Sequence, residues 1–117
     1  MSLTAALACL VALTYVGFGA PKILALPPMR RLAAHAGFSV PAYRVIGALE
    51  VAGAAAAAVG PAVPPLGVLA GAGLLLLMAG AVITHARRGD GVRALVPATV
   101  CALLVTAYLT SLLTTLE

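Results

Sequence analysis

Long apolar segments, separated by short connections rich in proline and glycine, dominate the hydropathy pattern of this 117-residue chain. A helix needs roughly 20 apolar residues to cross a hydrocarbon core about 30 Å thick. Four windows meet this requirement: Ser2 to Ala20, Pro41 to Val59, Pro65 to Thr84 and Leu95 to Leu116. The pattern predicts a single domain over residues 1–117, an all-α integral membrane protein built as a four-helix up-and-down bundle.

The connection between the first two windows is long enough to hold a short additional helix. Pro28 suits a first helical turn and Gly37 suits a helix end, so Pro28 to Ala36 is predicted to form a helix along the membrane interface. Ser39 can cap the next spanning helix, and Pro41 falls in its first turn, where a missing amide hydrogen costs little.

Composition supports a membrane protein and excludes several other classes. Hydrophobic residues make up 63% of the chain and charged residues 9%, with a mean hydropathy of +1.16. The net charge of +4 does not indicate a nucleic-acid partner, because the basic residues sit beside hydrophobic segments. Cys9 and Cys101 lie in apolar runs without a ligand-spaced companion, so no metal site or thiol redox centre is predicted.

The distribution of positive charge predicts the orientation in the membrane. Six of the seven basic residues lie in the first and third connections, and Arg44 adjoins the first. The positive-inside rule then places both basic connections in the cytoplasm and both termini outside. The expected location is the inner (cytoplasmic) membrane of a cell.

Glu50 is the most informative residue for function. It lies near the middle of the second window, where a carboxylate costs roughly 3 kcal/mol unless it is paired or protonated. Arg44 lies about 9 Å nearer the cytoplasm and about 120° round the helix axis, so it reaches Glu50 only obliquely. Partners from other helices are therefore expected.

The antiparallel arrangement nominates these partners by depth. Lys22 and Tyr15 share a face of the first helix, with Tyr15 about 10 Å deeper and close to the level of Glu50. His85 ends the third window on the same side, and Thr99 lies one to two turns into the fourth. We expect a polar pocket in the cytoplasmic half with catalytic Glu50 and His85 and substrate-binding Tyr15, Lys22, Arg44 and Thr99.

Structural explanations compete with these functional ones. Lys22 and Arg44 can extend to the headgroups, and His85 can be an ordinary interfacial residue. His35 is expected in solvent, and Tyr108 is expected in the outer aromatic belt.

The third window is rich in small residues, including Gly67 and Gly71 at GxxxG spacing. Such faces let membrane helices approach closely, and helix packing is the simpler interpretation. Four helices make a thin bundle, so a homodimer or a membrane complex partner is also considered.

Three segments resemble the DoxX-like family of small membrane proteins: Gly19 to Lys22, Tyr43 to Gly53, and Met78 to His85 continued by Arg87 to Asp90. The resemblance spans nearly the whole chain. It implies a compact four-helix membrane fold with functional positions at Lys22, Arg44, Glu50 and His85. It does not imply one reaction, because founding members of the family look like quinone-linked subunits of thiosulfate oxidation and others are associated with redox-stress complexes.

Three functions remain open at this stage. The first is an enzyme that isomerises, cyclises or opens an epoxide in a lipophilic small molecule by acid/base chemistry, which needs no cofactor. The second is a quinone-binding or redox accessory subunit, in which quinone is the cofactor and a partner protein supplies electrons. The third is a structural membrane partner whose buried charges fix the register of the helices.

Overall fold

A computed structural model describes residues 2–116, and within them all regular secondary structure is helical. The helices are α1 (Leu3–Ile23), α2 (Pro27–Ala36), α3 (Val40–Val59), α4 (Pro64–Arg87) and α5 (Val92–Thr114). The long helices α1, α3, α4 and α5 are each apolar enough to cross a membrane, which confirms the predicted four-helix membrane bundle. Residues 1 and 117, the ends of the predicted domain, lie outside the described residues.

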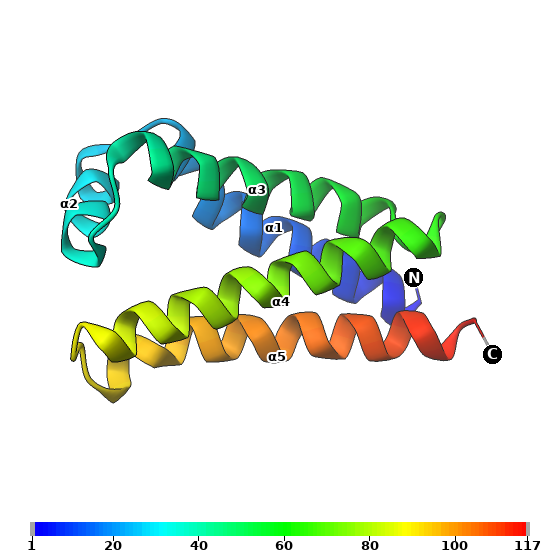
Figure 1. Ribbon diagram of the computed structural model, residues 1–117. Coiled ribbons are helices and arrows are strands. Elements are labelled where there is room, and N and C mark those ends of the chain that lie inside the picture. The colour runs from blue at the N-terminus through cyan, green and yellow to red at the C-terminus, as the bar shows by residue number, and fades with distance from the viewer. Residues whose placement is uncertain (1, 117) are drawn as a thin grey trace.

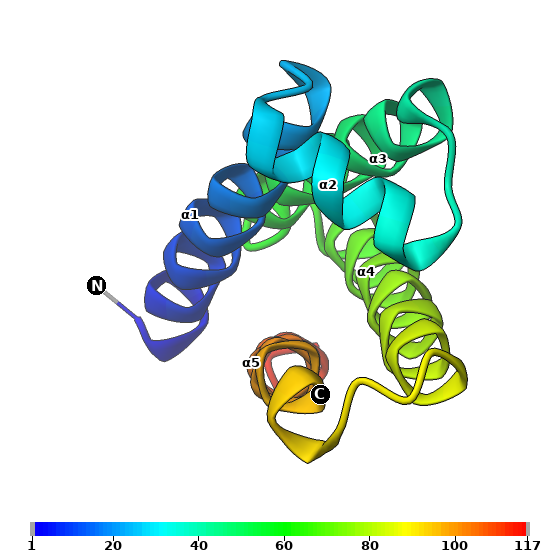
Figure 2. The ribbon, with the colours of Figure 1, turned by 90° about the vertical axis from the view of Figure 1, so that its left-hand side faces the viewer.

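The four long helices form two pairs, α1 with α3 and α4 with α5 (Figure 1). Both ends of the chain lie at one end of the bundle, where the pairs come together; we call this the packed end. The pairs diverge toward the other end, which carries α2 and the α4–α5 connection; we call this the open end. Figure 2 shows α2 crossing the open end from the side of α1 toward α4.

Local sequence explains where the helices begin and end. The hydroxyl oxygens of Ser2 and Ser39 accept hydrogen bonds from backbone amides in the first turns of α1 and α3. Gly37 ends α2 in the left-handed region at φ 84°, which suits glycine. Helix α1 continues three residues beyond the predicted end and includes Pro21, so Lys22 stays on the helix.

Two glycines bring α1 and α3 unusually close. A Cβ atom on Gly19 would lie 2.6 Å from the carbonyl oxygen of Gly47, and a Cβ on Gly47 would lie 2.6 Å from the carbonyl oxygen of Gly19. Real Cβ atoms do not approach so closely, so only glycine fits at this crossing. The contact lies beside Lys22 and Glu50 and sets the distance between the helices that carry them.

Tyr108 fills the packed end, which corrects the expectation that it belongs to an outer aromatic belt. Its side chain is fully buried, and its hydroxyl donates a hydrogen bond of 2.7 Å to the carbonyl oxygen of Ala57. The ring fits because Gly60 and Gly67 leave room around its hydroxyl. Nearby, the side chains of Thr4 and Ser111 share a 2.5 Å hydrogen bond between α1 and α5.

The open end is held by a different set of contacts. Asp90, in the α4–α5 connection, accepts hydrogen bonds from His35 of α2 at 2.5 Å and from His85 of α4 at 2.7 Å. We call these three residues the histidine clasp. Arg88 adds a hydrogen bond of 3.2 Å to the carbonyl oxygen of Ala36. The expectation that His35 is merely solvated is thus incomplete, because its exposed ring is tied to Asp90.

Candidate functional site

Lys22 of α1 and Glu50 of α3 form an ion pair inside the bundle. The ammonium nitrogen of Lys22 donates to Oε1 of Glu50 at 2.5 Å, and the two side chains are 14% and 1% exposed. The second carboxylate oxygen, Oε2, is buried and has no hydrogen-bond partner within the described part of the chain. Buried polar atoms without partners are rare in folded proteins, so this atom is a candidate for contact with a ligand.

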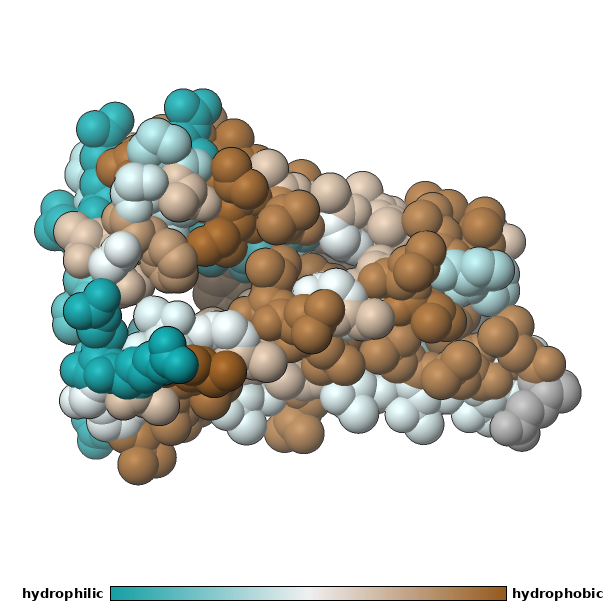
Figure 3. Space-filling view, viewed as in Figure 1, coloured by the Kyte–Doolittle hydropathy of each residue, from teal (hydrophilic) through white to brown (hydrophobic). Residues whose placement is uncertain are grey.

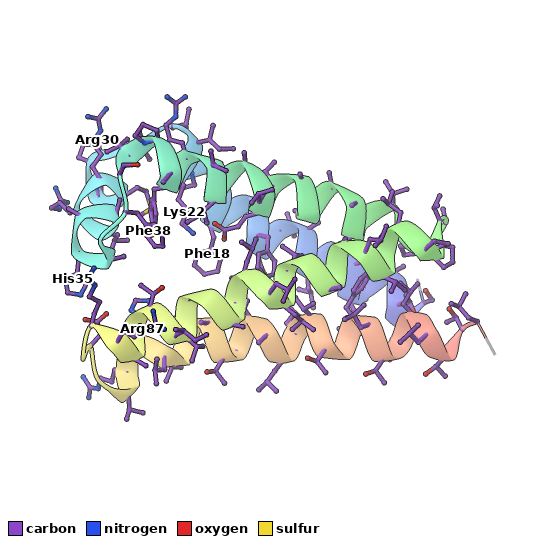
Figure 4. All side chains as sticks on the ribbon, viewed as in Figure 1. Phe18, Lys22, Arg30, His35, Phe38 and Arg87 are labelled. Carbon is purple, nitrogen blue, oxygen red and sulfur yellow. The ribbon has the colours of Figure 1, made fainter. Side chains whose placement is uncertain are left out.

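Two aromatic rings surround the Lys22 ammonium group. Its nitrogen lies 5.9 Å from the ring centre of Phe18, one turn earlier on α1, and 5.3 Å from that of Tyr43 on α3. These distances allow cation–π attraction, which helps to keep a positive charge away from water. Figure 4 shows Phe18 and Lys22 pointing from α1 into the space between the two helix pairs.

The ion pair lines a cavity of about 420 Å³ in the open half of the bundle. A second cavity of about 280 Å³ adjoins it and shares Lys22, Glu50 and His85 in its wall. The rest of the wall is mostly apolar and includes Met78 and Cys101. A cavity with apolar walls and a few convergent polar groups is the usual form of a site for a small molecule.

His85 connects the cavity with the histidine clasp. Its ring lines both cavities, and its Nδ1 donates to Asp90 at the open end of the bundle. Hydrogen bonds from His85 and from His35 hold the pKa of the half-buried Asp90 carboxyl below its usual range. Because Asp90 fixes Nδ1 as the protonated nitrogen, Nε2 of a neutral His85 is left as an acceptor.

The sequence profile of the DoxX-like family matches residues 6–107, which is most of the chain. The chain belongs to the DoxX-like family. No curated protein and no solved structure matches it significantly. The family therefore supports a membrane location for this DoxX-like protein and agrees with the four apolar helices.

In this DoxX-like protein, the residues predicted to form the site fall into two groups. Lys22, Glu50 and His85 come together around the cavity. Tyr15 is buried just outside the cavity wall, where its hydroxyl donates a 3.3 Å hydrogen bond to the carbonyl oxygen of Cys101. Arg44 is exposed and donates from Nε to the carbonyl oxygen of Ile23 at 2.8 Å, so it supports the end of α1 instead of lining the cavity.

Thr99 is also separate from the cavity. It lies exposed on α5, whereas the preceding Ala98 is buried in the cavity wall. Two other threonines of α5 show what polar side chains do on such a surface: Thr106 and Thr114 donate to the carbonyl oxygens four residues earlier. Backbone bonding of this kind satisfies a hydroxyl without any ligand.

Sequence reasoning missed Asp90 and Tyr43 as members of this site. Tyr43 lies seven residues before Glu50 and therefore on the same face of α3, a signal that could have identified it. Asp90 contacts His35, which lies 55 positions earlier in the sequence, and no local sequence pattern predicts such a contact. Within residues 2–116 no group of three His, Cys, Asp or Glu side chains is arranged to hold a metal ion.

Proposed function

We propose that this DoxX-like protein binds a lipophilic small molecule in the cavity beside Glu50 and transforms it by acid/base chemistry. The observation that supports the proposal most directly is the state of the Glu50 carboxylate. One oxygen is held by Lys22 at 2.5 Å, while the other is buried and has no partner among the described residues. The Glu50 residue as a whole lines the cavity. A positioned carboxylate with one free oxygen is suited to accept and return a proton.

The proposed chemistry needs no redox partner. In an isomerisation, Oε2 of Glu50 removes a proton from one atom of the ligand and a proton returns to another atom, so that the carboxylate is restored. A cyclisation or an epoxide opening follows the same scheme, with an internal nucleophile or water attacking carbon while the oxygen that leaves carbon is protonated. General acid/base catalysis of this kind contributes about 10² to 10⁴ in rate.

The neighbouring residues have complementary roles in the proposal. Lys22 orients Glu50 and offers its remaining donors to an oxygen-bearing end of the ligand. His85 exchanges protons between the cavity and the open end of the bundle, where Asp90 holds its ring. The apolar walls, including Met78, contact the rest of the molecule and exclude water.

We further propose that the open end faces the cytoplasm. Hydrophilic residues gather at this end in the space-filling view (Figure 3), and the basic residues lie in α2, in the flanking turns of the long helices and in the α4–α5 connection. Positively charged segments are retained on the cytoplasmic side during membrane insertion. Labelling of a single cysteine introduced at Arg31 should then require a reagent that enters the cell.

The central test compares Glu50→Gln with the wild-type protein and with Thr106→Val. The amide keeps the size of the carboxylate but cannot act as a base, whereas Thr106 lies on the exposed side of α5. Organic extracts of the three purified proteins are analysed by mass spectrometry, and the enriched compounds are incubated with each protein in liposomes. We expect turnover to fall by about 100-fold or more in Glu50→Gln and to be unchanged in Thr106→Val. Equal turnover in wild type and Glu50→Gln overturns the proposal.

A second candidate function is quinone binding, and the Lys22 ammonium group is the observation that favours it. A quinone carbonyl could accept a hydrogen bond from this half-buried donor while its ring lies among the apolar side chains of the cavity. The extract distinguishes the two functions. A compound whose ultraviolet spectrum changes reversibly on reduction, and which the protein binds without converting it, supports the quinone site and argues against acid/base turnover.

A further inference from the structure

The two adjoining cavities together form one site, whose larger and smaller parts reach the outside of the bundle on different sides. Its larger part extends between α1 and α5, where Gly17, Phe18 and Pro97 are exposed and line it. Its smaller part extends between α3 and α4, where Leu76 and Gly80 are exposed and line it. Figure 3 shows the second side, where the surface is hollowed between α4 and the part of the molecule that holds α2 and the start of α3.

The residues at these two openings are those of a lipid-facing surface. Phe18 is 42% exposed and Leu76 is 75% exposed, and none of the exposed residues that edge the openings within the long helices carries a charge. Both openings lie along segments that are apolar enough to cross a membrane. Hydrocarbon tails would therefore surround them, because the openings fall within the spans rather than beyond their ends.

A route from water would start at the open end, where His35 and Phe38 are exposed and line the smaller part of the cavity. Helix α2 crosses the open end (Figure 2), and its C-terminal turn is tied across to α4 by the histidine clasp and by Arg88. Figure 4 shows His35 pointing from α2 toward the α4–α5 connection. A molecule arriving from the aqueous side would meet these polar contacts first.

We infer that the ligand reaches Glu50 sideways from the bilayer, through the openings between α1 and α5 and between α3 and α4. The ligand class is then an amphiphile dissolved in the membrane, with an apolar body and one hydrogen-bonding end. The apolar body slides between the helices while the polar end reaches Lys22 and Glu50. This inference rests on the proposed function for what happens at Glu50, but the access route can be measured without turnover.

Glycines at the two openings allow the route to be blocked. A Cβ atom added to Gly17 or to Gly80 would meet nothing within 4 Å, so both positions accept a larger side chain without a backbone clash. Gly17 lines the larger part of the cavity and Gly80 lines the smaller part. Gly73 on α4 is equally open but lines neither part, which makes Gly73→Leu the matched control.

The experiment uses the whole protein in liposomes and a small apolar aryl diazirine that partitions into the bilayer. After illumination, labelling is localised by mass spectrometry at the buried residues Glu50, Met78 and Cys101. We expect labelling of these residues in the wild type and in Gly73→Leu. Gly17→Leu combined with Gly80→Leu should reduce it by about tenfold, because leucine side chains would fill gaps in a densely packed bundle.

A charged, water-soluble diazirine serves as the second probe and needs no variant. We expect it to leave Glu50, Met78 and Cys101 unlabelled; stronger interior labelling by this probe than by the apolar one overturns lateral access. Equal labelling of the wild type and the doubly blocked protein by the apolar probe also overturns it. If lateral labelling fails while Glu50→Gln still abolishes turnover, the access route is wrong and the proposed function stands. If lateral labelling succeeds while Glu50→Gln turns over normally, the access route stands and the proposed function is wrong.

Discussion

The two ends of this bundle are built from the same four helices but have different interiors. At the packed end, Gly60 and Gly67 lie against Tyr108, and the small residues and the large ring fill the space between α3, α4 and α5. At the open end, the helix pairs diverge (Figure 1), and a cavity of about 420 Å³ remains beside an ion pair. Close packing of small against large residues stabilises one end, and polar contacts hold the other.

The difference shows how a small membrane protein can hold a polar site. The close contact of Gly19 with Gly47 fixes α1 against α3 and places Lys22 beside Glu50. On the opposite side of the cavity, α4 and α5 remain apart from the α1–α3 pair, and α2 spans the gap between the two pairs at the open end. Rigidity along one helix pair and separation from the other together leave room for a ligand.

The largest effect is expected from removing the positive partner of the buried carboxylate. Lys22→Met would leave Glu50, which is only 1% exposed, without its counter-ion. Breaking one side of a buried pair costs about 3 kcal/mol of unfolding free energy, because a buried charge is left uncompensated. Unfolding in mixed micelles with increasing denaturing detergent would measure the loss.

The double variant Lys22→Met with Glu50→Gln provides the control. Removing both charges avoids the uncompensated carboxylate, so most of the lost unfolding free energy should return. If the single and double variants were equally destabilised, the pair would not be coupled as the 2.5 Å contact indicates.

A smaller loss should distinguish the packed end from the lipid-facing surface of the same helix. A Cβ atom on Gly67 would lie 2.6 Å from the hydroxyl oxygen of Tyr108, whereas a Cβ on Gly73 would meet nothing within 4 Å. Gly67→Val should therefore lower the unfolding free energy by about 2 kcal/mol through overpacking, and Gly73→Val should change it little. The same detergent titration measures both, and equal effects would contradict tight packing around Tyr108.

Hydropathy alone could predict much of this architecture. The four spanning helices follow from the length of the apolar windows, and α2 follows from Pro28 and Gly37. The predicted helix ends differ by up to three residues, because Pro21 is accommodated within the last turn of α1 and α4 continues to Arg87. Backbone bonding at helix ends tolerates such shifts.

The depth of each polar residue in the membrane could be predicted from the sequence, but the side chains that contact one another were harder to predict. Lys22 and Glu50 could be placed near each other from helix length and direction, but the distance between their atoms depends on the Gly19–Gly47 contact. The sequence also predicts Arg44 as a substrate-binding residue that reaches Glu50 obliquely, yet its guanidinium group bonds to the carbonyl oxygen of Ile23. Rotation about a helix axis decides between such candidates, and it is set by packing between elements distant in sequence.

The smallest effect concerns the histidine clasp at the open end, and it depends on pH. Because hydrogen bonds lower the pKa of Asp90, the clasp is stabilised above about pH 4 and is lost as the pH falls through that lowered pKa. Spin labels on cysteines introduced at Ala34 and Val92, in a background without Cys9 and Cys101, would report the distance between α2 and α5. We expect a narrow distance distribution near neutral pH and a broader one in strong acid.

The variant Asp90→Asn removes the carboxylate of the clasp. It should broaden the distance distribution near neutral pH and remove most of its pH dependence, while the unfolding midpoint stays close to that of the wild type. An unchanged narrow distribution in Asp90→Asn would show that Arg88 and the remaining contacts hold α2 in place without the clasp.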